Sequence, residues 1–240
     1  MPGGVGDRYD VCIVVPTYNE LENVRSLVAE VGKARGPDTA LLFVDDSSPD
    51  GTGLEIASMS KTEPWVRLLT RPGKMGIGSA YQEGFREAAS SLSPSIIVEM
   101  DADLQHPPSA IPELVNAVRG GADVAVGSRY VRGGGSSGWS RWRRLVSRTA
   151  NLYARKTLGL PVRDATSGFR AYTAEAALKV SEAGLPVRGF EFQVASLKAL
   201  KTSMKIVEVP YTFSHRAAGK SKLGIWDVAR FFVAVLRLAV

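Results

Sequence analysis

The stretch Ser95-Ile96-Ile97-Val98-Glu99-Met100-Asp101-Ala102-Asp103-Leu104-Gln105 contains an apolar run that is followed at once by two carboxylates and an amide. A short apolar run of this kind, bounded by polar residues, is typical of a buried strand. Two similar runs come earlier, at residues 9–15 and 40–44, and each also ends in a polar cluster. In open sheets of parallel strands, the ligand crevice lies outside the carboxyl ends of the strands. We therefore expect the three polar clusters to meet at one site.

Short β-branched runs alternate with longer helical patterns, which indicates an α/β fold with a mostly parallel open sheet flanked by helices. Further strands are expected at 66–70, 124–126, 168–172 and 205–210. Helices are expected near 20–33, 53–60, 76–91, 109–119 and 191–202, and in the arginine-rich stretch that runs to Leu158. The first helix should open with a capping box formed by Asn19 and Glu22. The Gly- and Ser-rich segment 133–138 is expected to be a mobile loop.

The composition is that of a soluble globular chain with one hydrophobic core. Its 240 residues are 45% hydrophobic and 22% charged, which excludes a disordered chain, a collagen and a disulfide scaffold. The single cysteine, Cys12, lies inside an apolar run, so we expect a buried thiol and a reducing, cytoplasmic setting. The sequence contains no run of about 18 apolar residues, the length that a membrane-spanning helix needs.

The net charge of +6 is concentrated in one part of the chain. Residues 129–163 carry nine basic side chains and no acidic one, whereas the rest carries 21 basic and 24 acidic residues, a net charge of −3. A positive region on a slightly acidic body indicates a localised anionic partner: nucleic acid, membrane lipid or a phosphorylated substrate. Because a nucleic-acid module has no use for three acidic strand ends, we expect no nucleic-acid partner.

The pair Asp101 and Asp103 indicates a metal site. Carboxylates at alternate positions of an extended segment point to the same side, and Gln105 continues that face. Such oxygen ligands suit Mg²⁺ or Mn²⁺, which proteins usually hold through one or two carboxylates together with substrate phosphates. Zinc fits poorly, because the whole chain has one cysteine and two histidines. We expect these three residues to bind Mg²⁺ or Mn²⁺ beside a diphosphate.

Two other phosphate-binding motifs do not match. A Walker sequence ending at Gly219-Lys220-Ser221 would need a glycine where the chain has Ser214. The glycine pattern at 73–78 follows the third expected strand instead of the first, so it is not a dinucleotide-binding fingerprint. Dinucleotide and NTPase functions are therefore disfavoured.

Seven blocks, in order along nearly the whole chain, resemble the inverting GT-A glycosyltransferases of family 2, and within them the polyprenol-phosphate (dolichol-phosphate) mannose synthases. The blocks lie at 15–20, 44–52, 73–81, 100–108, 127–130, 166–170 and 219–224. The Asp-Ala-Asp-Leu-Gln core also occurs in polyprenyl-phosphate glucosyltransferases. The blocks at 73–78 and 219–224 look more like those of the mannose enzymes. The resemblance implies a GT-A fold, a Rossmann-like nucleotide-diphospho-sugar transferase architecture.

The resemblance also implies roles for individual residues. GDP-mannose would be held by Pro16, Tyr18, Glu20, Val44, Asp46, Asp101, Ala102, Asp103, Gln105, Arg129, Arg216 and Lys222. Asp101, Asp103 and Arg129 would be the catalytic residues. Arg143, together with Arg144, would bind the phosphate of a polyprenyl or dolichyl phosphate acceptor.

The implied reaction moves mannose to the lipid phosphate with inversion, giving polyprenyl-phosphate β-mannose. A lipid monophosphate has a second pKa near 6, so it is largely dianionic at neutral pH and needs no dedicated general base. The departing GDP would be stabilised by the metal and the basic side chains. The alternative is glucose transfer from UDP-glucose to the same kind of acceptor.

The resemblance divides the chain into a flexible tail at 1–8, a glycosyltransferase domain at 9–223 and an amphipathic helix at 224–240. Within the domain, 9–130 would be the nucleotide-sugar half and 131–223 the acceptor half. The final helix, at about 1.5 Å per residue, is shorter than a hydrocarbon core of roughly 30 Å. We expect it to lie in the membrane interface or dock on the domain, making the protein peripheral at the cytoplasmic face. Some family members continue into membrane helices, so a fused membrane segment or a membrane-anchoring partner is a further expectation.

Overall fold

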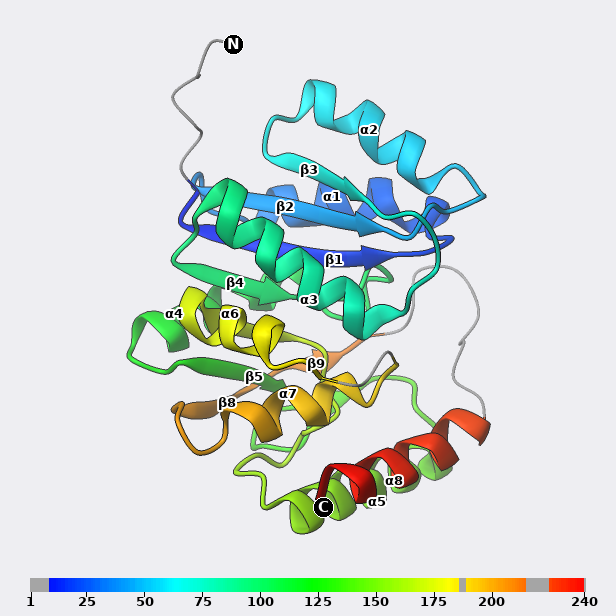
Figure 1. Ribbon diagram of the computed structural model, residues 1–240, viewed down its shortest axis with the longest axis vertical. Coiled ribbons are helices and arrows are strands. Elements are labelled where there is room, and N and C mark those ends of the chain that lie inside the picture. Colours follow the sequence, from blue (N-terminus) through cyan, green and yellow to red (C-terminus); the bar gives the residue numbers. More distant parts are fainter. Residues whose placement is uncertain (1–8, 186–188, 215–224, 240) are drawn as a thin grey trace.

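The computed structural model describes residues 9–185, 189–214 and 225–239, with only the backbone for 225–229. Seven strands form one sheet in the order β3-β2-β1-β4-β7-β5-β8 (Figure 1). They are β1 (Val11–Thr17), β2 (Thr39–Asp45), β3 (Val66–Thr70), β4 (Ile96–Glu99), β5 (Val124–Ser128), β7 (Arg170–Thr173) and β8 (Ile206–Pro210). Only β7 runs antiparallel to its neighbours in this sheet. The predicted mostly parallel α/β sheet is confirmed.

The sheet is covered by helices on both faces. The helices are α1 (Leu21–Ala34), α2 (Thr52–Thr62), α3 (Ile77–Glu87), α4 (Ile111–Arg119), α5 (Arg141–Leu158), α6 (Ala174–Glu182), α7 (Phe192–Leu200) and α8 (Ile225–Ala239). Helix α3 lies in front of β1 and β2 in Figure 1, whereas α1 lies behind them. Because the central strands are covered on both faces, their sequences are almost continuously apolar. Cys12 in β1 is fully buried, and burial raises the pKa of its thiol to about 12, so it is a packing residue.

The capping box predicted at the start of α1 is wrong. The helix begins at Leu21, and Asn19 adopts a left-handed backbone with φ of 56°. The N–H of Asn19 donates to Ser48 Oγ at 3.0 Å, and the N–H of Leu21 donates to Asp50 Oδ2 at 3.2 Å. The cap is therefore supplied by the loop after β2, a partner that a local motif does not reveal.

The mobile loop predicted at 133–138 is also wrong, because part of this segment is a strand. β6 (Gly135–Ser136) pairs in parallel with β9 (Thr212–Phe213), which lies far along the chain. At Gly134 an added Cβ would lie 2.3 Å from the carbonyl oxygen of Ser128. The glycines thus permit close backbone packing here. Helix α6 was not anticipated from the sequence.

Helix α3 approaches the sheet most closely at Gly84. A Cβ there would lie 2.5 Å from Val14 Cγ1 and 2.9 Å from Val44 Cγ2. Gly84→Ala is expected to lower the free energy of unfolding by about 1–3 kcal/mol, because both valines are buried and the helix must shift. Urea denaturation followed by tryptophan fluorescence measures this. Gly32→Ala in α1 is the control, since its Cβ would meet only Trp65 at 3.6 Å. Equal destabilisation by the two substitutions would contradict the packing argument.

Candidate active site

The loops after β1 and β2 are joined by hydrogen bonds at the carboxyl edge of the sheet. Thr17 Oγ1 donates to Asp45 Oδ1 at 2.9 Å, and the N–H of Glu20 donates to Thr52 Oγ1 at 3.0 Å. Strand β4 pairs with β1 on its other side, so the segment starting at Asp101 leaves the sheet at the same edge. The structure therefore brings together the three polar clusters that the sequence places after strands.

The segment 101–105 is held in shape by hydrogen bonds. Tyr81 Oη donates to Asp101 Oδ1 at 3.1 Å, and the N–H of Gln105 donates to Asp103 Oδ1 at 3.0 Å. Asp103 and Gln105 are buried, as is Ala102, whereas the side chain of Asp101 is about one-third exposed at 34%. The two carboxylates and the amide thus come from one compact turn, with Asp101 nearest to solvent.

His106 stabilises this turn through a hydrogen bond to the backbone of Asp101, a role that sequence reasoning missed. Its ring stacks on Phe169, with ring centroids 5.1 Å apart and an interplanar angle of 7°. Burial lowers the pKa of His106 to about 4, so the imidazole is neutral at pH 7. Its Nδ1 therefore accepts a hydrogen bond from the N–H of Asp101, at 3.2 Å. This contact fixes the point where the chain leaves β4.

The donor atoms of this segment suit a hard divalent cation. Among the described residues, no group of three or more His, Cys, Asp and Glu side chains is arranged to hold a metal by itself. Asp101, Asp103 and Gln105 offer carboxylate and amide oxygens, which Mg²⁺ and Mn²⁺ accept when substrate phosphates complete the coordination. The residues present fit a metal that binds together with a diphosphate.

Asp46, expected to contact the donor, is buried in an ion-pair network. Its Oδ1 lies 2.8 Å from Arg71 Nη1, and its Oδ2 accepts the N–H of Met75 at 2.9 Å. Arg71 is also buried and pairs with Glu83 at 2.9 Å. Asp46 therefore shapes the loop between β3 and α3. Sequence reasoning missed Arg71, although a charged residue directly after a strand was a usable signal.

The other residues expected at the nucleotide end line the same edge. Pro16, Tyr18 and Glu20 are half-buried, and Val44 is buried in β2. The ammonium of Lys74 lies 4.5 Å from the centroid of the Tyr18 ring, which ties the glycine-rich loop to the end of β1. These contacts keep the glycine-rich loop beside the acidic strand ends.

Arg129 is clamped by Asp164. Its Nε and Nη2 donate to Asp164 Oδ2 and Oδ1 at 2.7 and 2.6 Å, and Nη2 also donates to Thr166 Oγ1 at 2.9 Å. Burial works against the charged guanidinium, but the Asp164 carboxylate outweighs it and raises the pKa of Arg129 above its usual range. The arginine is thus a fixed cation, and its partner Asp164 was not foreseen.

The structure brings Arg143 close to Arg129. The Arg143 guanidinium lies 4.4 Å from the centroid of the Trp139 ring, and that of Arg129 lies 5.2 Å from the same centroid. Arg143 and Arg144 are both exposed in the first turn of α5, where Ser140 Oγ accepts the N–H of Arg143 at 3.1 Å. An exposed cation therefore stands beside the fixed one.

Arg216 and Lys222 lie outside the described residues. The described chain before them ends at Ser214, whose N–H donates to the carbonyl oxygen of Gln105 at 2.9 Å. Gln105 Nε2 donates to Ser214 O at 3.3 Å. The segment that leads toward the two basic residues is thus attached to the acidic turn.

A buried polar network lies behind the acidic turn. Glu99 is fully buried, and it accepts hydrogen bonds from Tyr172 Oη at 2.7 Å and from Gln193 Nε2. Burial raises the pKa of Glu99 to about 7, although nearby Arg170 opposes this. The sequence signal was a carboxylate inside an otherwise apolar strand. This network links β4, β7 and α7 two residues before Asp101.

This mostly parallel sheet has an acidic turn, residues 101–105, at its carboxyl edge and a basic cluster of Arg129, Arg143 and Arg144 beside it, an arrangement of the GT-A glycosyltransferase type. The family model for glycosyl transferase family 2 matches residues 12–180, and the chain belongs to that family. It is 41% identical to the polyprenol monophosphomannose synthase of Mycolicibacterium smegmatis, over 92% of this chain and 84% of that protein. It is 39% identical to the undecaprenyl-phosphate mannosyltransferase of Micrococcus luteus, over 95% of this chain and 93% of that protein.

Solved structures support the fold. Glucosyl-3-phosphoglycerate synthase from Mycobacterium tuberculosis, in complex with Mn²⁺, UDP-glucose and phosphoglyceric acid, superposes with a TM-score of 0.69. The match covers 96% of this chain and 80% of that one, at 20% sequence identity. The predicted GT-A fold and the resemblance to polyprenol-phosphate mannose synthases are both confirmed.

Proposed function

We propose that the protein transfers mannose from GDP-mannose to a polyprenyl or dolichyl monophosphate, with inversion, and releases polyprenyl-phosphate β-mannose. The observation that carries this proposal is the identity of 41% and 39% to two relatives named as mannose transferases with polyprenyl phosphate acceptors. The acidic turn and the basic cluster supply the two halves that such a reaction needs. Glucose transfer from UDP-glucose is not favoured, because neither relative is named for it.

At the donor, the acidic turn has the main role. Asp101, Asp103 and Gln105 would hold Mg²⁺ or Mn²⁺, which neutralises the diphosphate and stabilises the departing GDP. Tyr81 and His106 position Asp101 through the hydrogen bonds described above. Arg216 and Lys222 remain proposed donor contacts. The residues that contribute to this half therefore come from the turn after β4, from α3 and from the segment after β9.

At the acceptor, the phosphate is the nucleophile. Because it is largely dianionic at neutral pH, the protein must orient it and need not deprotonate it. Arg143 is exposed to solvent in the first turn of α5, whereas Arg129 is buried and held in place by Asp164. We assign phosphate capture to Arg143, with Arg144 beside it, and a fixed positive potential to Arg129.

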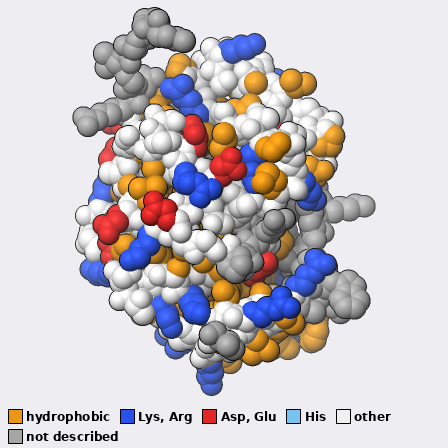
Figure 2. Space-filling view, in the orientation of Figure 1, with side chains coloured by type: hydrophobic (Ala, Val, Ile, Leu, Met, Phe, Trp, Pro, Cys, Tyr) orange, Lys and Arg blue, Asp and Glu red, His pale blue; other side chains and the backbone are white. Residues whose placement is uncertain are grey.

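We also propose that the protein associates peripherally with the cytoplasmic face of a membrane. No helix in the described part of the chain combines the length and apolar character that crossing a bilayer requires. Helix α8 packs against α5, where the Tyr153 and Phe232 ring centroids are 4.8 Å apart, yet Val233 and Leu236 stay exposed. Figure 2 shows apolar and basic side chains next to one another at the lower edge, over α5 and α8. Such a face suits an anionic membrane surface.

The test of the proposed function is mass spectrometry of the product formed from a polyprenyl phosphate with GDP-mannose or with UDP-glucose, in the presence of Mg²⁺. Polyprenyl-phosphate mannose is expected, and a hexose transferred only from UDP-glucose would contradict the proposal.

Arg143→Ala should raise the acceptor KM by about 30-fold, the equivalent of roughly 2 kcal/mol, and leave the donor KM unchanged. Arg141→Ala, on the same exposed turn, is the control. A changed donor KM with a normal acceptor KM would refute the assignment of Arg143 to the acceptor phosphate.

A further inference from the structure

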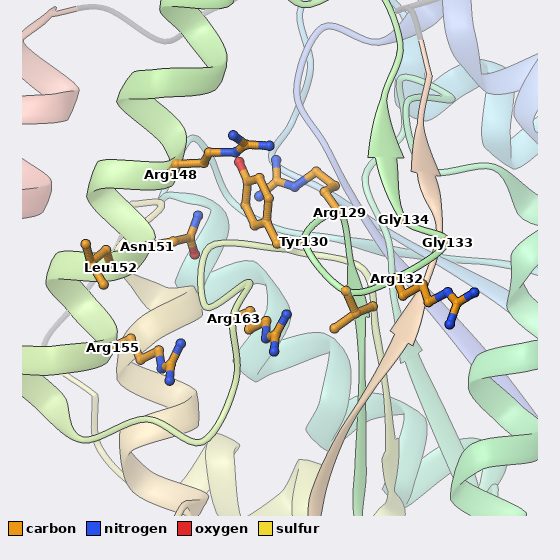
Figure 3. Close-up of a pocket in the computed structure, with 11 residues that line it drawn as sticks. Arg129, Tyr130, Arg132, Gly133, Gly134, Arg148, Asn151, Leu152, Arg155 and Arg163 are labelled. Atoms are coloured by element: carbon orange, nitrogen blue, oxygen red, sulfur yellow. The ribbon is translucent and has the colours of Figure 1, made fainter.

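A second basic site lies along α5, and Arg129 forms part of its lining. It is a pocket of about 710 Å³ between α5, the segment that follows β5 and the loop containing Arg163. Figure 3 shows Arg148, Asn151, Leu152 and Arg155 along one side of α5, with Arg163 across from Arg155. Neither Arg143 nor Arg144 lines this pocket. The pocket is therefore distinct from the proposed acceptor arginines.

Among the described residues, the positive charge in this pocket exceeds the carboxylates paired with it. Of the arginines that line it, Arg129 is paired with Asp164, and Arg132 points away from α5 in Figure 3. For Arg148, Arg155 and Arg163, no carboxylate lies within 4.0 Å in the part of the chain that the structure describes. Three guanidinium groups thus face one cavity without a carboxylate partner from residues 9–185, 189–214 or 230–239.

The Glu208 carboxylate contacts the loop that carries Arg163, but through the backbone of that loop. Glu208 accepts the backbone N–H groups of Arg163 and Asp164, at 2.9 and 3.0 Å, so it holds the loop and not the Arg163 guanidinium. Arg148 lies over the Tyr130 ring, 6.0 Å from its centroid. Guanidinium groups present a planar fork of donors that matches phosphate oxygens, and their mutual repulsion is relieved when an anion binds. The chemistry of the pocket is that of a phosphate site.

The wall of the pocket also has an apolar part that continues onto the surface. Leu152 lines the pocket and is 52% exposed. Of the nine large apolar side chains exposed among the described residues, five lie on α5 and α8. These five are Trp142, Leu145, Leu152, Val233 and Leu236. A ligand that matches both the guanidinium groups and the exposed apolar side chains carries a phosphate attached to a hydrocarbon chain.

We propose that the pocket formed by Arg148, Arg155, Arg163 and Leu152 binds the phosphate of an anionic membrane phospholipid, at a place separate from the acceptor site. A head group in this pocket fixes α5 and its apolar neighbours against the bilayer, so the protein docks in one orientation. The inference rests on the proposed membrane association and names the group that the surface recognises.

The test compares two double variants of α5 and its adjoining loop that each remove two positive charges. Arg155→Gln with Arg163→Gln changes the pocket, whereas Arg141→Gln with Lys156→Gln changes exposed positions on α5 outside it. Binding is measured by co-sedimentation with vesicles of three parts phosphatidylcholine to one part phosphatidylglycerol. A pocket that recognises phosphate predicts at least about tenfold weaker binding for the pocket variant than for the control variant. Equal losses would overturn the proposal, because diffuse attraction depends only on the number of charges.

Two further measurements identify the source of the phosphate and separate this site from catalysis. Without vesicles, inorganic phosphate at constant ionic strength should raise the melting temperature of the wild type more than that of the pocket variant, because the same guanidinium groups contact either source of phosphate. Selective stabilisation of the wild type, with vesicle binding alike in the pocket variant and the control variant, would identify free phosphate as the ligand and overturn the lipid assignment.

Mannose transfer to a short, water-soluble polyprenyl phosphate should be unchanged in the pocket variant. A raised acceptor KM would mean that the pocket is the acceptor site. Wild-type protein that binds vesicles but transfers no mannose would refute the proposed function alone.

Discussion

Asp103→Asn is expected to lower kcat by about 10³-fold, the size of loss seen when a main source of transition-state charge stabilisation is removed. Asp103 is buried in the turn after β4, and its Oδ1 accepts the N–H of Gln105. Asparagine keeps that acceptor and the shape of the side chain but loses the charge that attracts a divalent cation. Steady-state transfer assays measure kcat, and electron paramagnetic resonance of free Mn²⁺ measures metal binding in the presence of GDP.

Asp50→Asn is the matched control for this substitution. Asp50 lies at the same edge of the sheet, where its Oδ1 accepts the N–H of Thr52 at the start of α2. Asparagine keeps the acceptor for Thr52 but loses the one that receives the N–H of Leu21, so this variant should lose about 1 kcal/mol of stability and keep nearly all of its activity. Full activity of Asp103→Asn, unchanged Mn²⁺ affinity, or full wild-type activity in excess chelator would contradict the metal assignment.

Asp164→Asn is expected to lower the free energy of unfolding by about 3–5 kcal/mol, because it leaves the buried charge of Arg129 without its counterion. The Asp164 side chain is fully buried, and that of Arg129 is 7% exposed. Guanidinium chloride unfolding measures the change. Transfer activity should fall as well, since Arg129 loses the contacts that orient it.

Two comparisons isolate the effect of burial. Asp10→Asn breaks the exposed ion pair between Asp10 and Arg119, which has the same 2.6 Å separation, and should cost less than about 1 kcal/mol. Arg129→Met combined with Asp164→Asn removes both buried charges and should recover part of the stability without restoring activity. A cost for Asp164→Asn no larger than that for Asp10→Asn would refute the argument.

Most strands of the sheet were predictable because they are short apolar runs in the sequence, a pattern that burial in the sheet requires. The strand expected at 66–70 coincides with β3, and those expected at 40–44 and 124–126 fall within β2 and β5. A central strand that is covered on both faces must be apolar along its length, and this requirement is visible in sequence. Helix α5 was also expected, in the arginine-rich stretch that ends at Leu158. Helix α6 and strand β6 were missed because their packing partners are remote.

The acidic turn shows how far the residues themselves specify the site. Asp101, Asp103 and Gln105 lie within five residues directly after a strand, so their closeness and their preference for a hard cation are visible in the sequence. The extended segment expected there is wrong, because the chain turns after β4 and Leu104 adopts a left-handed backbone with φ of 60°. The cluster of positive charge at 129–163 is likewise a property of the chain. The sequence by itself thus determined the fold class, the acidic cluster and the concentration of positive charge in one part of the chain.

The tertiary structure decided what each charged side chain does. Asp46 pairs with Arg71, and Arg129 pairs with Asp164, so each charge is held by a partner that its position in the chain does not reveal. His106 is neutral because Phe169 and its neighbours bury it. The physical reason is that the protonation state and availability of a charged group depend on the dielectric environment and counter-charges that surround it. Those surroundings come from strands and loops that are distant in sequence, and only folding brings them together.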